Sequence, residues 1–189
     1  MNDYPLRLEI DHSEEYSRFM PLVKWLLVIP HYIVLAILGI GAFFAIVIAW
    51  FAVLITGRYP RGLWNYVTGV MRWSARVTAY FYLMVDPYPS FSLEDDPDYP
   101  ARFQLDYPEH VDRWRPLVAW ILAIPYLIIA GILVYIAYVL VFFAFFTILF
   151  ARSFPKGMFD IVVVALRWQA RGNAYALWLV TRYPPWVWG

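Results

Sequence analysis

The chain has 189 residues, of which 62% are hydrophobic, 21% aromatic and 15% charged. A soluble domain has about 45–50% apolar and about 25% charged residues, so this composition is typical of a membrane protein. The net charge of +1 argues against a large basic surface for nucleic acid. Because cysteine is absent, disulfides, thiolate nucleophiles and cysteine-bound metal centres are excluded.

The first 20 residues are polar and mixed in charge, so we expect no cleavable signal peptide. Within them Leu6, Leu8 and Ile10 alternate with charged residues, and residues 101–105 repeat this alternation. A period of two predicts a half-buried strand in each place. We expect both strands on the cytoplasmic side, where they can form a small sheet.

Two long runs without charge follow these strands, Trp25–Gly57 and Leu117–Ala151. One straight helix of that length would be ~50 Å long, whereas the hydrocarbon layer of a bilayer is ~30 Å thick. We therefore expect each run to fold into a hairpin of two short membrane helices, over about residues 20–57 and 115–151.

Proline and glycine residues interrupt these apolar runs. Pro30 and Pro125 should kink the first helix of each hairpin. Gly39 and Gly41 can break the first hairpin, but the second run has no glycine at the matching positions.

The chain is an internal repeat, because it aligns with itself without a gap after a shift of 95 residues. We divide it into two units, residues 1–94 and 95–189, and one hypothesis makes residues 91–105 a β-hairpin that joins them. Identical residues in equivalent places include Arg18 and Arg113, Pro21 and Pro116, Trp25 and Trp120, Arg72 and Arg167, Trp73 and Trp168, and Arg76 and Arg171.

A third helical stretch closes each unit, at about residues 62–85 and 157–180. Its polar residues fall on one face, so we expect an amphipathic helix in the membrane interface. If it spanned the bilayer instead, the units would be inverted and its arginines would lie near mid-bilayer at ~2.5–3.5 kcal/mol each.

With interfacial third helices, all fifteen Lys and Arg residues fall on one side of the membrane. The positive-inside rule makes that side cytoplasmic. We thus predict an all-α, multi-pass protein of the cell (inner) membrane with four short membrane helices and both termini in the cytoplasm. Its two units would be related by a pseudo-twofold axis along the membrane normal. The alternative is that the hairpins enter and leave the membrane without fully crossing it, because ~17 residues is the minimum for a span.

The candidate binding residues are the arginine pairs and the tryptophan beside each, which could hold lipid phosphates or a partner's carboxylates. They are Arg72, Trp73, Arg76, Arg167, Trp168 and Arg171. Alternatively, the arginines bind acids of their own unit and tie the helix to the strands, and repetition in both units favours this slightly. The acids considered are Asp11, Asp86, Asp106 and Asp160.

His31 is the polar candidate within the apolar run, where an ionisable residue is a functional candidate by default. The other unit has Tyr126 in its place. This favours hydrogen bonding near the carbonyl freed by Pro30 over contact with a ligand or quinone.

No nucleophile, nucleotide-binding or metalloprotease motif is present, so we expect no catalytic residue, metal or cofactor. The leading hypothesis is a non-catalytic accessory or scaffold subunit of a larger membrane complex, or a lipid-organising protein. Its expected partners are membrane lipids and another protein or a second copy, with no nucleic acid. A small transporter or channel of repeated units is the alternative, and a membrane enzyme acting on lipid comes third.

Three sequence motifs carry a family resemblance: R-x-x-P-L-V-x-W-x-L-x-I-P at residues 18–30, T-G-R-Y-P at 56–60 and R-W-x-x-R-V-x-A-Y at 72–80. With them the chain resembles an uncharacterised family of bacterial and archaeal membrane domains of unknown function. The resemblance covers nearly the whole chain and implies a membrane domain, often in tandem. It implies no activity.

Overall fold

Two short strands form the centre of the fold in the computed structural model, which describes residues 4–188. β1 (Leu6–Ile10) and β2 (Ala101–Leu105) lie at the predicted positions and pair antiparallel. The hypothesis of a β-hairpin within residues 91–105 is therefore wrong, because the partner of β2 comes from the start of the chain.

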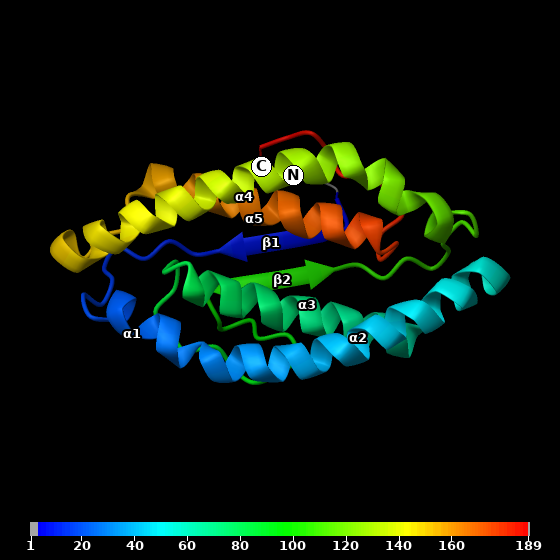
Figure 1. Cartoon of the computed structure of the whole chain (residues 1–189), viewed down its shortest axis with the longest axis horizontal. Coiled ribbons are helices and arrows are strands. Elements are labelled where there is room, and N and C mark those ends of the chain that lie inside the picture. Colours follow the sequence, from blue (N-terminus) through cyan, green and yellow to red (C-terminus); the bar gives the residue numbers. More distant parts are fainter. Residues whose placement is uncertain (1–3, 189) are drawn as a thin grey trace.

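The register of this sheet shows how the two units are related. Leu8 and Phe103 lie opposite each other at its middle, and their numbers differ by 95, the offset of the internal repeat. A pseudo-twofold axis that passes between these two residues therefore relates the two units. Figure 1 shows the result, because each helix runs opposite to its counterpart across the centre of the molecule.

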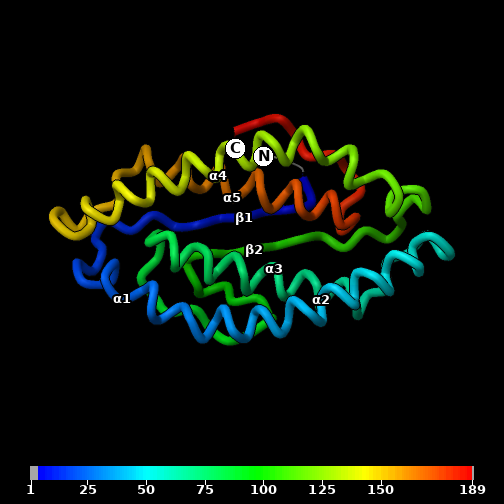
Figure 2. Tube along the Cα trace, in the orientation of Figure 1, coloured from blue at the N-terminus to red at the C-terminus, as the bar shows by residue number. Residues whose placement is uncertain are grey.

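Two helices flank the sheet and correspond to the predicted third stretch of each unit. They are α3 (Arg61–Phe81) and α5 (Lys156–Ala176), and each begins directly after a proline. α3 packs against β2 and α5 against β1. Each helix thus contacts the strand of the other unit, an exchange that can be followed in the tube of Figure 2.

The charge-free runs form the outer helices. α2 (Ile29–Thr56) follows the short α1 (Met20–Leu27), and α4 (Arg115–Ala151) is unbroken. α2 packs along α3, and α4 packs along α5. Neither run folds back on itself, so the predicted two-helix hairpins and four short membrane helices are wrong. Each run forms one helical segment of 37 residues, long and apolar enough to cross a membrane.

The glycines that suggested a turn have another role. A Cβ atom at Gly41 would lie 2.5 Å from the hydroxyl oxygen of Tyr66 in α3, so this glycine admits a close contact between helices. Gly39 also lies within α2, and a side chain at this position would point into open space. Pro125 lies inside α4, whereas Pro30 accompanies a one-residue interruption between α1 and α2.

On α2 and α4, mostly small residues face the interior of the protein, whereas large apolar residues face outward. Fewer than a third of the residues in the most apolar part of each are buried. A broad apolar surface is therefore left without a partner in the described part of the chain. The small residues of the buried stripes are Ala42, Ala45, Ala49, Ala119, Ala123, Ala130, Ala137 and Ala144.

Equivalent hydrogen bonds join the units at both ends. The amide of Val111 donates to the carbonyl of Gly57 at 2.9 Å, and the amide of Tyr16 donates to Arg152 at 2.9 Å. Gly57 (φ 69°) and Arg152 (φ 56°) both adopt the left-handed conformation that ends α2 and α4. The second unit therefore places an arginine where the conformation favours glycine.

Candidate functional site

Two of the predicted arginines cap the outer edges of the sheet. Nε of Arg72 donates to the carbonyl of Phe103 at 3.1 Å, and Nε of Arg167 donates to that of Leu8 at 2.7 Å. These carbonyls belong to the residues at the symmetry axis, and each arginine reaches the strand of the other unit. Hydrogen bonds from charged donors contribute about 1.5–3 kcal/mol, so the pair ties the units together.

Arg76 and Arg171 are buried, and their surroundings differ. Arg76 donates to the carbonyl of Glu94 at 3.2 Å and lies 4.0 Å from the carboxylate of Asp96. Its burial lowers the pKa of the Arg76 guanidinium. Arg171 lies 5.6 Å from the ring centre of Tyr4. Within residues 4–188, Nε and Nη1 of Arg171 have no hydrogen-bond partner.

The two predicted tryptophans also point inward. Nε1 of Trp73 donates to Nδ1 of His31 at 3.1 Å, and Nε1 of Trp168 donates to the carbonyl of Val187 at 3.0 Å. Both indoles are buried. Binding of lipid or a partner by the six candidate residues stays a prediction. Most of their polar atoms bond within the chain, so the structure favours the alternative that they hold helices, strands and tails together. The acids considered for that role are not their partners, because Asp11, Asp86, Asp106 and Asp160 pair with Arg102, Lys24, Arg7 and Lys156.

His31 lies in an aromatic box that the tail of the first unit closes. Its ring stacks on Phe91 at 4.0 Å between centroids with 14° between planes, and Tyr88 lies at 4.8 Å. His31 is hydrogen-bonded as expected, but its partner is Trp73. The neighbouring carbonyl of Leu27, where α1 ends, accepts from the hydroxyl of Tyr88 at 3.1 Å.

The second unit repeats the box with Tyr126 in place of His31. Tyr126 stacks on Trp168 at 4.7 Å with 8° between planes, and Trp186 lies at 5.2 Å. The hydroxyl of Tyr183 lies 3.4 Å from the carbonyl of Leu122, which matches the bond of Tyr88. In both boxes, the C-terminal tail of a unit packs against the long helix of the same unit. Their shared role is therefore packing.

The structure adds a buried lysine that the sequence analysis did not single out. Nζ of Lys24 donates to the carbonyl of Val85 and to the carboxylate of Asp86, both at 2.7 Å. Asp86 also accepts from the amide of Ser17 at 2.7 Å. In the sequence, this lysine could have been recognised as the one charged residue in an otherwise apolar helix. The equivalent residue of the second unit is Ala119, so the buried ion pair is present in the first unit alone.

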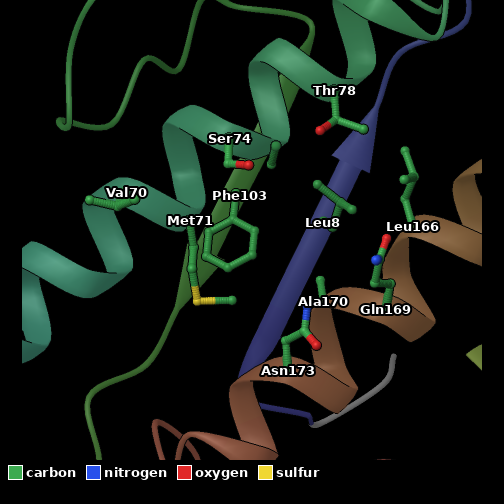
Figure 3. Close-up of a pocket in the computed structure, with 11 residues that line it drawn as sticks. Leu8, Val70, Met71, Ser74, Thr78, Phe103, Leu166, Gln169, Ala170 and Asn173 are labelled. Carbon is green, nitrogen blue, oxygen red and sulfur yellow. The ribbon is translucent and has the colours of Figure 1, made fainter. Parts of the chain in front are cut away.

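A trough of about 310 Å³ lies over the centre of the sheet, between α3 and α5. Figure 3 shows Leu8 and Phe103 at its floor, with residues of the two helices on both sides. Its lining carries no charge, so it suits an uncharged group. The helical lining residues are Val70, Met71, Ser74, Ala75, Thr78, Leu166, Gln169, Ala170 and Asn173.

Among residues 4–188, no group of three or more His, Cys, Asp or Glu side chains is placed to hold a metal ion. Nε2 of His12 lies 2.7 Å from the carbonyl of Phe154 and so helps to hold the N-terminal segment on the other unit.

The fold defines a class of protein: a tandem helical repeat, joined through exchanged strands, with long apolar helices on its flanks. Residues 21–92 and 113–187 each match the family described as Domain of unknown function (DUF4389). The chain belongs to this family and carries two copies of its domain, as the resemblance predicted. No curated protein and no solved structure matches the chain.

Proposed function

We propose that the protein is a non-catalytic membrane scaffold that lies flat in the cytoplasmic leaflet of the cell (inner) membrane. The observation that carries the proposal is the apolar outer surface of α2 and α4, which no other part of residues 4–188 covers. A helix that is apolar over most of its surface belongs in a protein core or in lipid. Fewer than a third of the residues in these stretches are buried, which favours lipid or a partner.

The position of the sheet argues against a crossing arrangement. Figure 1 shows β1 and β2 near the middle of the long axis, alongside α2 and α4. If the long helices crossed the bilayer, the sheet would lie near its centre with Arg7, Glu9 and Asp106 exposed. Each charge there costs about 2.5–3.5 kcal/mol on insertion scales.

A flat arrangement separates charged and uncharged surfaces. Leu8 and Phe103 face the uncharged trough, so the alternating charged residues of the strands lie on the opposite face of the sheet. Arg72 and Arg76 lie on the side of α3 opposite the trough and hold the acidic turn that follows Leu93. With the trough toward the lipid, the charged face meets the cytoplasm and the twofold axis follows the membrane normal.

The proposed role follows from this surface. The arginines and His31 bond within the chain, whereas the outer helices offer a wide apolar and aromatic surface. Such a surface suits membrane lipids and the membrane part of a protein partner or a second copy. We therefore propose that the protein organises lipid around a larger complex or serves as its accessory subunit.

Labelling with a membrane-impermeant maleimide tests the arrangement, because the natural chain has no cysteine. Arg18→Cys and Arg58→Cys place exposed thiols at opposite ends of the long helical segment α1–α2. We expect both to react in inside-out vesicles and neither in right-side-out vesicles. Phe44→Cys, on the outer face of α2, should react in neither and is the control.

Reaction of Arg18→Cys and Arg58→Cys from opposite sides would refute the flat arrangement and favour a carrier with inverted units. The scaffold role is tested separately by purification from the native membrane. Recovery of a monomer without bound protein or lipid would refute that role.

A further inference from the structure

A second cavity lies between the two units, at one end of the molecule. It has a volume of about 440 Å³ and is bounded by α1, the end of α3 and α4. Most of its lining side chains are aromatic, including Trp25, Tyr82 and Phe145. Sites for small molecules often lie at interfaces between domains and have volumes of about 300–1,000 Å³.

The internal symmetry shows what the equivalent place in the other half holds. Pro21 and Phe145, which line the cavity, correspond to Pro116 and Trp50. Nε1 of Trp50 donates to the carbonyl of Pro116 at 3.1 Å. One half thus places a two-ring aromatic group with an N–H donor against the start of α4. Phe145 supplies neither the second ring nor the donor in the other half.

The lining carries no unpaired charge. Lys24 is its one charged residue, and Nζ of Lys24 is held by the carbonyl of Val85 and the carboxylate of Asp86. The rings of Tyr82 and Tyr138 lie 5.5 Å apart in the wall. The cavity therefore offers aromatic faces and suits an uncharged ligand.

We infer that this cavity binds an uncharged, planar aromatic compound with one N–H or O–H donor. Its ring takes the place that the indole of Trp50 fills in the other half. Its donor binds the carbonyl of Pro21, as Trp50 binds that of Pro116. The inference rests on the internal symmetry and the cavity and not on the proposed scaffold role, although Trp25, Phe142 and Phe146 of the lining also belong to the exposed apolar surface.

The test uses the full chain in detergent micelles and 5-fluoroindole, observed by ¹⁹F NMR, with empty micelles as the background. We expect saturable binding at one site per chain. Unlabelled indole should displace the probe about fivefold better than indene, which has the same shape without the N–H, as one hydrogen bond predicts. Equal displacement by both compounds would overturn the role of the donor.

Two variants exchange the residues of the two halves. Phe145→Trp fills the cavity and should abolish saturable binding, whereas Trp50→Phe opens the equivalent place and should raise the stoichiometry to two. A folded Phe145→Trp variant that binds like the natural chain would refute the site. If this variant does not fold, Trp50→Phe decides alone, because two sites support the inference and one site overturns it.

Discussion

The two glycines in α2 allow a direct test of the continuous helix. A Cβ atom at Gly39 would meet nothing within 4 Å, whereas one at Gly41 would lie 2.5 Å from the hydroxyl oxygen of Tyr66. Gly39→Ala and Gly41→Ala are therefore a matched pair of substitutions in one helix. We expect them to change the free energy of unfolding in opposite directions.

The magnitudes follow from the surroundings. Alanine is about 1 kcal/mol more favourable than glycine in a helix interior, so Gly39→Ala should stabilise by that amount. Gly41→Ala has the same gain but must displace Tyr66, whose hydroxyl donates to the carbonyl of Leu38 at 2.9 Å. Overpacking costs about 1–3 kcal/mol and a lost hydrogen bond about 0.5–1.5 kcal/mol. The net destabilisation is therefore roughly 0.5–3.5 kcal/mol.

Thermal unfolding in detergent, followed by tryptophan fluorescence, measures both effects. For a chain of this size, 1 kcal/mol corresponds to about 2–4 °C in the midpoint. Adding Tyr66→Phe to Gly41→Ala removes the hydroxyl that clashes, so it should recover part of the loss in a double-mutant cycle.

Destabilisation of similar size by both alanines would refute this reasoning. That result would be the one expected if neither glycine lay in open space.

Three further outcomes are expected from thermal unfolding. His31→Phe leaves the indole N–H of Trp73 buried without its acceptor, at a cost of about 1–3 kcal/mol, but it also removes Nε2 of His31, which is buried without a partner in the described residues. Adding Trp73→Phe should recover part of any loss, and a double-mutant cycle without coupling between the two residues would contradict the role of this bond. Arg152→Gly should stabilise by roughly 0.5–1 kcal/mol, because the left-handed φ of 56° costs an arginine more than a glycine; a lower midpoint would show that the side chain has a role of its own. The hydrogen bond from Arg102 lowers the pKa of Asp11 below 3.8, so the ion pair stabilises the fold above pH 3.8 and is lost as the pH falls through the lowered pKa. Asp11→Asn should therefore lower the midpoint at pH 7 but not below the lowered pKa, and a difference that persists there would contradict this account.

The sequence by itself determined the elements that depend on local pattern. Alternation located both strands, and the shift of 95 residues located the repeat and its equivalent residues. The polar residues that share one helical face located α3 and α5 to within a few residues. Local propensity and repetition are properties of the chain itself, so they needed no tertiary information.

Only the tertiary structure decided which elements meet. A glycine in an apolar run is consistent with a turn or with a close helix contact, and the position of Tyr66 makes Gly41 a contact. In the same way, the arginine stripe was consistent with lipid or with acids of its own unit. The exchange of strands gives Arg72 the carbonyl of Phe103 and gives Arg167 that of Leu8. Hydrogen bonds between residues this far apart in the chain depend on how the two units pack. A local sequence pattern does not predict that packing.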